Sequence, residues 1–418
     1  MRLRIELHAR TKPGPCHWAI FHFSAAALLL SSLALSAQSG SGAAAVSDFT
    51  FIQASDVHAP ITQSKSTIAK IHGLGAINLA PFGLQAAKPS FVIMTGDLNE
   101  FGGGSGWWET YQSYWKGCAL PHYPVLGNHD NTWHANIKPL RGLGCGPYYS
   151  FDQHGCHFVA LMTATAQDPR PSLGEEQILW LKKDLEKVGS QRPVFVFFHH
   201  PLPGMEFASS YDYDRLLDVL HDYNTVLLLA GHSHGYGHQQ VEGLDQITGG
   251  STFGPNAGFA VVSVKAGVLR AAYWKADQPA PSEKLIEKPI PAKSSYPRIE
   301  IFSPAFRSSC GSALTISARL SGPVAIERAT YRVDDEDDAV SGPLTLTGAA
   351  PQWTAAGSVE LGKLLPGAHY LRVDFATGKE HYTRNTEFFF ETPSRPTAWR
   401  AYLAASSKVT PTVAAGLV

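Results

Sequence analysis

Short apolar runs that end in polar clusters recur between residues 49 and 234. Six of them are typical of β-strands and span residues 49–58, 91–98, 123–130, 157–163, 194–200 and 225–234. Because most of these runs are continuously apolar, they predict strands that are buried on both faces of a sheet. The segment Gly174–Val188 predicts a covering helix, with one helical face formed by Ile178, Leu179, Leu181, Leu185 and Val188. The pattern indicates a layered α/β domain.

A hairpin and a change in composition mark the end of this domain. Residues 260–264 and 268–274 flank a Lys-Ala-Gly turn, which predicts the antiparallel pair that closes the domain. Residues 276–297 then contain five prolines and six charged residues, a composition typical of an extended linker that forms no core. We therefore assign the α/β domain to residues 47–275 and a proline-rich linker to residues 276–297.

Alternation of apolar and polar residues returns beyond the linker, without a helical period. The segments 314–320, 331–333, 369–375 and 387–391 are separated by turn signals such as Pro366-Gly367. They predict a small all-β sandwich of the immunoglobulin or fibronectin kind over residues 298–393, followed by a tail over residues 394–418. Sandwich folds do not specify a function, so packing against the α/β domain and recruitment of a surface or a partner are both open.

The first 45 residues have the organisation of an export signal. A basic start is followed by the eleven-residue stretch AAALLLSSLAL at 25–35. This length matches the ~7–15 residues of a secretory signal and falls short of the ~20 residues of a spanning helix. We expect export to a periplasmic, extracellular or lumenal compartment, with cleavage after Ser36, Ser39 or Ala45. The alternative is an uncleaved N-terminal anchor, and no other stable membrane span is expected.

Composition restricts the classes of partner. The chain has 34 Lys and Arg against 35 Asp and Glu, a formal charge of -1, so no strong overall field would attract it to nucleic acid. The 18 histidines, in a chain with only 17% charged residues, direct attention to metal ligands.

Four cysteines remain if Cys16 is removed with the signal. They are Cys118, Cys145, Cys156 and Cys310, which allow three pairings. We narrowly favour a Cys118–Cys145 bridge over unpaired buried thiols.

Polar side chains follow five of the six predicted strands. These side chains are Asp56, His58, Asp97, Asn128, His129, Asp130, His199, His200, His232 and His234. Loops beyond the carboxyl ends of strands form the ligand-binding edge of an α/β sheet, so we expect these residues to converge there. On an extended segment Asp56 and His58 point the same way and would hold one ion, whereas His232 and His234 would reach two neighbouring ions.

Two Asp, four His and one Asn among these residues suit a pair of borderline divalent ions such as Mn, Zn, Fe or Ni. Asp97 is the expected bridge between them. Two divalent cations carry four positive charges, of which Asp56, Asp97 and a bridging hydroxide would neutralise three. The site would keep a net charge of about +1, which complements a phosphodiester anion. The hydroxide is the expected nucleophile, His129 the acid that protonates the leaving alkoxide, and Asp130 the group that orients the His129 ring.

The ordered motifs D-V-H (56–58), G-D (96–97), G-N-H-D (127–130), H-H-P (199–201) and G-H-S-H (231–234) resemble those of the calcineurin-like metallophosphoesterase family over roughly 49–275. The resemblance implies a four-layer sandwich of two sheets flanked by helices. It also implies metal one held by Asp56, His58, Asp97 and His234, metal two held by Asp97, Asn128, His199 and His232, and His129 as the acid. His199 is taken as the ligand, not His200, because the family places it two residues before the proline.

One departure narrows the expected chemistry. Glu100 stands where purple acid phosphatases carry a tyrosine, and those enzymes have no ligand at the position of His58. D-x-H with G-D-L is similar to the branch of cyclic-nucleotide and glycerophosphodiester phosphodiesterases. We expect a small phosphoester as substrate, with a diester favoured and phosphomonoesterase or nucleotidase activity as the alternative.

Two other classes of function compete with this interpretation. Gly231–Gly235 also spells G-x-S-x-G after an apolar strand, the nucleophile elbow of a serine hydrolase, with Ser233 as the nucleophile. An elbow requires a helix next, whereas residues 236–243 contain two glycines and no apolar period. The second rival is a non-catalytic binding protein built on a decayed phosphoesterase scaffold, which the intact set of ligands disfavours.

Overall fold

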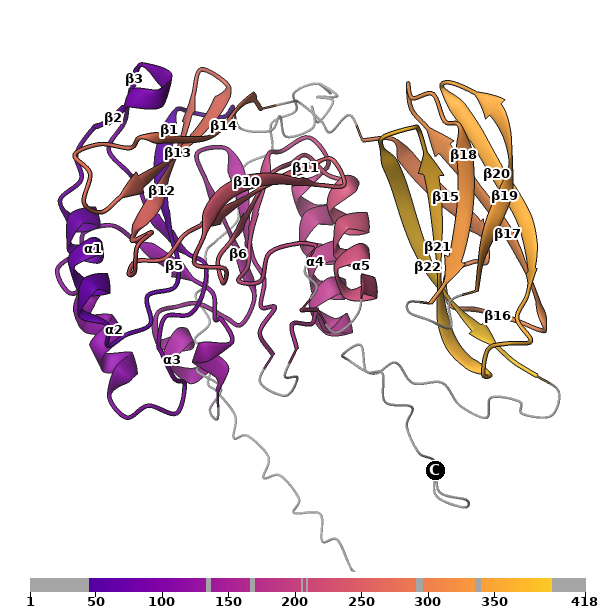
Figure 1. Ribbon diagram of the computed structural model, residues 1–418, viewed down its shortest axis with the longest axis horizontal. Helices are drawn as coiled ribbons and strands as arrows, with labels where there is room; N and C mark the ends of the chain where they lie inside the picture. Colours follow the sequence, from indigo (N-terminus) through magenta and orange to yellow (C-terminus); the bar gives the residue numbers. More distant parts are fainter. Residues whose placement is uncertain are drawn as a thin grey trace, which may run out of the picture. The chain divides into compact units, whose positions relative to one another are not determined.

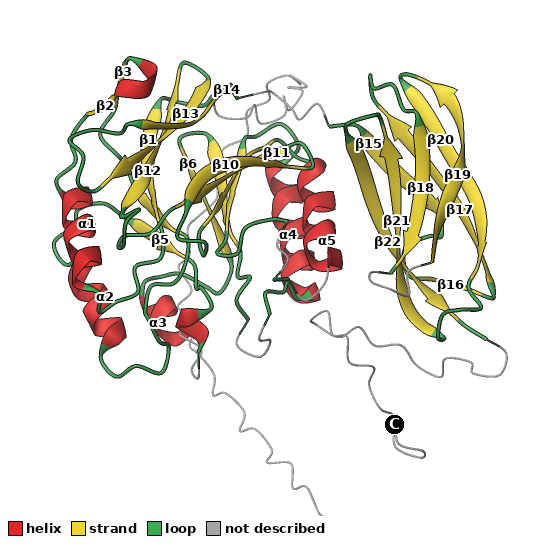
Figure 2. Ribbon diagram, in the orientation of Figure 1, coloured by secondary structure: helices red, strands yellow, loops and turns green. Residues whose placement is uncertain are grey.

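The computed structural model describes residues 45–132, 137–165, 170–203, 206–207, 210–290, 296–334 and 340–392 (Figure 1). The predicted export signal, except for its last residue, and the predicted tail lie outside these residues, as does most of the acidic run at 334–338. Helices are interspersed among the strands up to residue 221, and the described residues beyond it form strands without helices (Figure 2). Within the described ranges, no helix has both the length and the hydropathy that crossing a bilayer requires.

Two six-stranded sheets form the α/β part of the chain. The first contains, in spatial order, β14 (Glu283–Pro289), β13 (Val268–Lys275), β12 (Gly258–Lys265), β1 (Phe49–Ala54), β4 (Val92–Met94) and β5 (His122–Pro124). The second contains β10 (Tyr236–Val241), β11 (Leu244–Gly249), β9 (Thr225–Ala230), β8 (Val194–Phe197), β7 (Cys156–Ala160) and β6 (Tyr149–Gln153). Strands β1, β4 and β5 are parallel, as are β7, β8, β9 and β11, so each sheet has a parallel centre.

Aromatic side chains fill the space between the two sheets. Phe51 of β1 and Phe195 of β8 are fully buried, with ring centroids 5.8 Å apart in an edge-on arrangement. The next residue of β1, Ile52, belongs to the hydrophobic cluster on the opposite face of the same sheet. Both faces of β1 are therefore buried, which explains its continuous apolar sequence.

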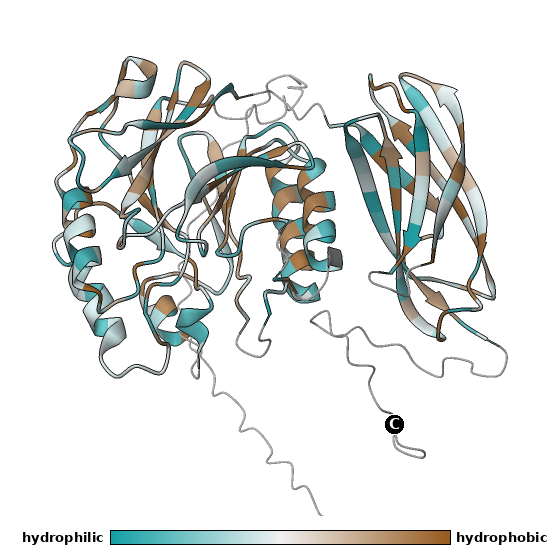
Figure 3. Ribbon diagram, in the orientation of Figure 1, coloured by the Kyte–Doolittle hydropathy of each residue, from teal (hydrophilic) through white to brown (hydrophobic). Residues whose placement is uncertain are grey.

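Helices cover the outer face of each sheet. Buried residues of α1 (Thr62–His72) and α2 (Trp107–Trp115) pack in one cluster with β1 and β4, and those of α4 (Glu175–Val188) and α5 (Ser210–His221) pack with β7, β8 and β9. The helix expected near 174–188 is thus confirmed as α4, and its ribbon alternates between hydrophobic and hydrophilic residues (Figure 3). The assignment of Leu179 to the covering face is wrong, because this side chain is 42% exposed. The short α3 (Ile137–Gly142), the hairpin β2 (Ile77–Leu79) and β3 (Leu84–Ala86), and the 3-10 turns at Ala80–Phe82 and His129–Asn131 complete a helix–sheet–sheet–helix arrangement.

The strands beyond residue 296 enclose a hydrophobic core of their own. In spatial order they are β15 (Arg298–Ser303), β17 (Ala313–Ser321), β20 (Gln352–Glu360), β19 (Val340–Ala349), β18 (Arg328–Val333), β21 (Gly367–Ala376), β22 (His381–Phe390) and β16 (Ser308–Cys310). The first half of β19 pairs with β18 and its second half with β20, so this strand joins two sheets over one core. A β-rich region is present as expected, while its immunoglobulin-like kinship stays a prediction.

The proline-rich segment after the closing hairpin is more ordered than its composition predicts. Residues Glu283–Pro289 form β14, which pairs with β13 at the edge of the first sheet. Ile286 is 7% exposed and belongs to the cluster between the sheets. The expectation that residues 276–297 contribute nothing to a core is wrong, because the run Glu-Lys-Leu-Ile-Glu-Lys is long enough for one edge strand, where proline is tolerated at the ends.

The expected Cys118–Cys145 bridge is also wrong. Cys118, Cys145, Cys156 and Cys310 are all free thiols. Cys118 and Cys145 lie in the cluster beneath α1 and α2, where packing against apolar neighbours suits a neutral thiol. Burial raises the pKa of the Cys145 thiol and raises that of Cys156 to about 12, so neither forms a reactive thiolate near neutral pH.

Candidate metal centre

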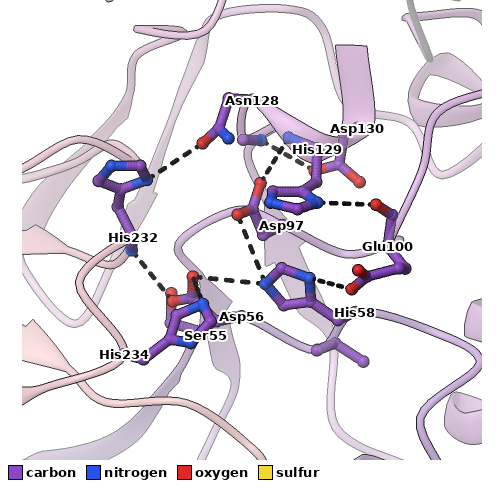
Figure 4. A network of polar contacts seen from close by, with 12 residues as sticks. Ser55, Asp56, His58, Asp97, Glu100, Asn128, His129, Asp130, His232 and His234 are labelled. Atoms are coloured by element: carbon purple, nitrogen blue, oxygen red, sulfur yellow. Dashed lines mark hydrogen bonds and ion pairs between the residues drawn. The ribbon is translucent and has the colours of Figure 1, made fainter. Parts of the chain in front are cut away.

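The seven predicted ligands lie together at one rim of the two sheets. Figure 4 labels all of them except His199. Each sits on a loop that follows the carboxyl end of a parallel strand: β1, β4 and β5 in the first sheet, β8 and β9 in the second. The strands end earlier than the apolar runs predict. For example, β1 ends at Ala54 and β9 at Ala230, which leaves the polar residues of both motifs on loops.

Five of the seven side chains stand on left-handed backbone. The φ angles are 52° at Asp56, 47° at His58, 49° at Asp97, 67° at His232 and 54° at His234. A residue other than glycine is uncommon in this region and costs of order 1–3 kcal/mol, and such strain tends to occur at functional sites. Asp56 and His58 do face one pocket, as expected. The reason is different, because the segment is left-handed at both residues and not extended.

Backbone hydrogen bonds between two of these loops hold the strained residues in place. Val57 and His58 both donate their N–H groups to the carbonyl of Asp97, at 2.8 and 2.9 Å. Ala59 donates to Leu98, and Glu100 in turn donates to Ala59, each at 3.0 Å. The loops after β1 and β4 thus act as one rigid unit, which offsets part of the cost of the left-handed conformations.

Two motif glycines permit the close approach of these loops. A Cβ atom on Gly96 would lie 2.4 Å from Nδ1 of His199, and one on Gly127 would lie 2.1 Å from Oδ1 of Asp97. Any larger residue would therefore push a predicted ligand out of position. The glycines of the G-D and G-N-H-D motifs therefore leave room for the ligands beside them.

Four electron-pair donors converge at the position predicted for metal two. Oδ1 of Asn128 lies 3.0 Å from Nε2 of His199 and 3.1 Å from Nδ1 of His232, and the two histidine nitrogens are 3.2 Å apart. Oδ2 of Asp97 lies 3.3 Å from Nε2 of His199. Metal–ligand bonds of about 2.0–2.2 Å place neighbouring ligand atoms roughly 3.0–3.5 Å apart, so these spacings fit a single bound cation.

No hydrogen is available to join these donors when the histidines are neutral. His199 uses its Nδ1 hydrogen on the carbonyl of Thr95 at 2.8 Å, and His232 uses its Nε2 hydrogen on the carboxylate of Glu206 at 2.6 Å. The opposite nitrogens therefore present lone pairs to the oxygen of Asn128. A metal cation would satisfy such a cluster.

A second cluster occupies the position predicted for metal one. Nε2 of His58 lies 3.5 Å from Oδ2 of Asp97 and 3.9 Å from Oδ1 of Asp56, and Nε2 of His234 lies 3.5 Å from the same Asp56 oxygen. Oδ1 of Asp56 and Nε2 of His58 are both buried and have no hydrogen-bond partner. Buried polar atoms without partners are rare and costly, so these atoms fit a cation.

One oxygen atom belongs to both clusters. Oδ2 of Asp97 faces His58 on one side and His199 on the other, whereas Oδ1 of Asp97 accepts a hydrogen bond from the backbone N–H of His129 at 2.9 Å. A carboxylate oxygen shared in this way is the geometry of a bridging ligand between two ions.

The field of the carboxylates favours positive charge in both clusters. Burial opposes protonation of His199, but Asp97 outweighs it and raises the pKa of His199 to about 9. Burial also opposes protonation of His58, and Asp56, Asp97 and Glu100 together raise the pKa of that ring. The carboxyl group of Asp97 is strongly buried, yet the neighbouring histidines hold its pKa well below the usual range. The same field would stabilise a bound cation.

His129 is held by a group that the sequence did not indicate. Its Nδ1 donates to the backbone carbonyl of Glu100 at 2.7 Å, which leaves Nε2 for a substrate. Asp130 is fully buried, and its oxygens accept hydrogen bonds from the backbone N–H groups of Gly127, Leu98 and Asn99. The prediction that Asp130 orients the His129 ring is corrected: Asp130 fixes the loops that carry His129 and Asp97. Burial, and then Asp97, raise the pKa of Asp130 to about 6, against those three donors.

Ser233 does not take the role of nucleophile, and His200 lies beside the metal-two cluster, with a ring nitrogen within 4.8 Å of ring nitrogens of His199 and His232. Nδ1 of His200 lies 2.9 Å from the hydroxyl of Thr163, and burial together with His199 and His232 holds the pKa of His200 well below its usual value. Ser233 is exposed, accepts a hydrogen bond from the N–H of Gly235, and is followed by strand β10. The helix that a nucleophile elbow requires is therefore replaced by a strand.

Two glutamates contact the predicted ligands from outside the clusters. Oε2 of Glu100 lies 2.6 Å from Nδ1 of His58, and Oε2 of Glu206 lies 2.6 Å from Nε2 of His232. Sequence reasoning treated Glu100 only as a missing tyrosine and did not consider Glu206. The signal for Glu100 was its place three residues after Asp97, whereas nothing in the sequence around Glu206 marks it.

Comparisons with known proteins find phosphoesterases similar to this chain. The family model for the calcineurin-like phosphoesterases matches residues 49–236. A probable glycerophosphodiester phosphodiesterase GpdQ from Arcobacter nitrofigilis is 30% identical over 162 residues, which cover 35% of this chain and 57% of that protein. Purple acid phosphatase 15 from Arabidopsis thaliana is 30% identical over 156 residues, which cover 31% of this chain and 29% of that protein. The chain thus spans about half or less of the length of these relatives.

Solved structures also resemble the chain at low identity. GAP50, the anchor in the inner membrane complex of Plasmodium, superposes with a TM-score of 0.44 at 16% identity, over 59% of this chain and 90% of that one.

Proposed function

We propose that this chain, whose residues 49–236 match the calcineurin-like phosphoesterases, is an exported hydrolase of phosphoesters that works with two divalent metal ions. Asp56, His58, Asp97 and His234 would hold one ion, and Asp97, Asn128, His199 and His232 would hold the other. The observation that carries this proposal is the single oxygen of Asp97 that faces both clusters. When bound, such an ion pair orients a phosphoryl group, neutralises its charge and activates water for attack at phosphorus.

His129 is placed to handle the leaving group. Its Nδ1 hydrogen is occupied by the Glu100 carbonyl, and its ring packs edge-on against His58 with centroids 4.5 Å apart. His129 is therefore beside both clusters, and its Nε2 remains available. In its protonated form His129 would donate the Nε2 proton to the departing alkoxide, a contribution of about 10²–10⁴ in rate.

A diester needs room for a second organic group, and a cleft of about 210 Å³ lies beside His234. Its lining combines an aromatic ring and a proline with small polar residues: Ser233, His234, Gly235, Ser251, Phe253, Gly254, Pro255 and Asn256. The ring of Phe253 packs edge-on against His58 and His234, each at 5.2 Å between centroids. We propose that the organic group of the substrate lies against Phe253.

The wall of this cleft is fixed before any substrate binds. Thr252 donates both its N–H and its hydroxyl to the carbonyl of Asp56, at 3.3 and 3.2 Å. Gly254 accepts and donates hydrogen bonds with the side chain of Gln63 on α1. Because the segment on either side of Phe253 is tied down, the ring would meet the substrate at little cost in entropy.

Paired assays test this function. Metal-free protein reloaded with Mn, Zn or Fe would be assayed on bis-p-nitrophenyl phosphate and p-nitrophenyl phosphate. We expect turnover of both, with the higher kcat/KM on the diester, and loss of turnover in a chelator. Phe253→Ala should raise KM for the diester more than for the monoester. Preference for the monoester would favour the alternative, a phosphomonoesterase or nucleotidase, and absence of metal-dependent turnover would remove the proposal.

A further inference from the structure

Each of the two clusters contains one histidine that is backed by a carboxylate. In the cluster for metal one it is His58, whose Nδ1 lies 2.6 Å from Oε2 of Glu100. In the cluster for metal two it is His232, whose Nε2 lies 2.6 Å from Oε2 of Glu206. The remaining buried histidine ligand, His199, is backed by a neutral backbone carbonyl.

The two glutamates select opposite tautomers. A carboxylate accepts and cannot donate, so Glu100 keeps the hydrogen of His58 on Nδ1 and leaves the lone pair of Nε2 toward Asp56 and Asp97. Glu206 keeps the hydrogen of His232 on Nε2 and leaves the lone pair of Nδ1 toward Asn128 and His199. In both rings the nitrogen left with a lone pair is the one that faces the cluster.

Glu100 also reaches the predicted acid. While its side chain contacts His58, its backbone carbonyl accepts the Nδ1 hydrogen of His129 at 2.7 Å (Figure 4). Its own N–H donates to Ala59 at 3.0 Å, and this bond ties the residue to the loop that carries His58. The side chain of His58 is 2% exposed, whereas that of Glu100 is 45% exposed. The carboxylate can therefore be changed without opening the core.

We propose that Glu100 and Glu206 are positioning residues, one for each ion: Glu100 fixes the ring of His58 for metal one, and Glu206 fixes the ring of His232 for metal two. The proposal rests on the two-ion function proposed above. Outer carboxylates of this kind orient a ligating histidine and increase its basicity, and their loss weakens metal binding by about 10–100-fold.

Metal affinity measured on the full chain tests the proposal independently of activity. Metal-free wild type, Glu100→Ala, Glu100→Gln and Glu206→Ala would each be titrated with Zn²⁺ against a competing chelator. We expect two binding events in the wild type, with one weakened about 10–100-fold in Glu100→Ala and the other weakened in Glu206→Ala. Glu100→Gln should lie between, because its amide oxygen still accepts the His58 hydrogen but carries no charge.

The variant Asn128→Ala assigns each effect to its site. Removal of Asn128 should leave only the ion held by Asp56, His58, Asp97 and His234. In that background, Glu100→Ala should weaken the remaining event about 10–100-fold, the range for loss of an outer carboxylate, and Glu206→Ala should leave it unchanged. A second readout is the ¹⁵N tautomer pattern of the His58 ring in the metal-free protein, at a pH high enough for the ring to be neutral, which should shift away from Nδ1–H in Glu100→Ala.

Three results would overturn the proposal: unchanged affinities in both alanine variants, equal weakening of both events by either variant, or an unchanged His58 tautomer in Glu100→Ala. Thermal unfolding of each metal-free variant should match the wild type within a few degrees, since both glutamates are partly exposed. If the wild type itself binds no ion, the two-ion function fails first, and that outcome is distinct from failure of the positioning roles.

Discussion

At the scale of the residue, a variant of His129 distinguishes a role in metal binding from a role in proton transfer. Its ring contacts the Glu100 carbonyl and the edge of His58, while its backbone N–H binds Asp97. His129→Ala keeps that backbone contact and removes only the imidazole. We expect metal content to stay unchanged and kcat to fall about 10²–10⁴-fold. Measurement of both on one preparation checks this, and loss of metal would place His129 among the ligands.

The glycine of G-N-H-D gives a second prediction at this scale. A Cβ at Gly127 would lie 2.1 Å from Oδ1 and 2.5 Å from the backbone nitrogen of Asp97. Gly127→Ala should therefore displace the shared carboxylate and weaken both binding events at least tenfold in a chelator titration, with about 1–3 kcal/mol lost from stability through overpacking. Gly75→Ala, where no atom lies within 4 Å of the added Cβ, is the matched control. Equal metal affinity in the two variants would contradict the steric argument.

The sequence was sufficient to predict which residues converge, but not the hydrogen-bond partner of each. The spacing of Asp56, Asp97 and His199 relative to predicted strand ends was sufficient to predict convergence, because parallel strands present their carboxyl ends at one edge. The partner of His129 could not be predicted, because it is a backbone carbonyl, which every residue has. Asp130 was misjudged for the same reason: adjacency in sequence does not specify which of several nearby N–H groups a carboxylate accepts from.

At the scale of the element, apolar runs predicted the strands but not their ends. The run at 49–58 continues for four residues beyond β1, which ends at Ala54. Asp56 and His58 turn into left-handed backbone, and that conformation is stabilised by the loop after β4, far away in the sequence. Local propensity carries no information about such a contact. The edge strand β14 was missed for a related reason, since its composition is that of a linker and only pairing with β13 makes it a strand.

His122 in β5 gives a prediction about the packing of elements. Its ring stacks on Trp115 of α2 with centroids 4.7 Å apart, and burial, with a smaller effect of His72, lowers the pKa of His122 to about 4. The folded protein thus binds this proton less readily than the unfolded chain, whose histidines titrate near 6.5. The lowered pKa of His122 therefore costs no stability above about pH 6.5, where the ring is neutral in both states. The free energy of unfolding falls as the pH falls from about 6.5 toward 4.

Variants at this position test the packing directly. The wild type should lose up to about 3 kcal/mol of its free energy of unfolding between pH 6.5 and 4 through His122 alone. His122→Phe should show a shallower decline over the same interval in urea unfolding monitored by circular dichroism. Parallel curves for the two proteins would mean that the ring is not buried against α2.

At the scale of the whole molecule, the family resemblance carried by five ordered motifs implied two sheets with helices outside, and the structure has that arrangement. The pairing of cysteines could not be predicted, because Cys118 and Cys145 share a hydrophobic cluster without a bond. Whether neighbouring thiols join depends on the relative directions of their Cβ atoms, which sequence does not give.

The count of free thiols tests this result together with export. Cys118, Cys145, Cys156 and Cys310 are free, and Cys16 lies in the predicted signal. Mature protein that has lost the signal should therefore show about four reactive thiols per chain after denaturation without reductant. Two thiols would reveal a disulfide, and five would show that the N-terminal segment is retained.

The central claim is that one carboxylate joins two metal ions. Oδ2 of Asp97 faces His58 of one cluster at 3.5 Å and His199 of the other at 3.3 Å. The most direct measurement is the metal content of wild type and Asp97→Ala, purified side by side and analysed by mass spectrometry of the elements. We predict about two ions per chain in the wild type and nearly none in the variant. Two ions retained in Asp97→Ala would contradict the account.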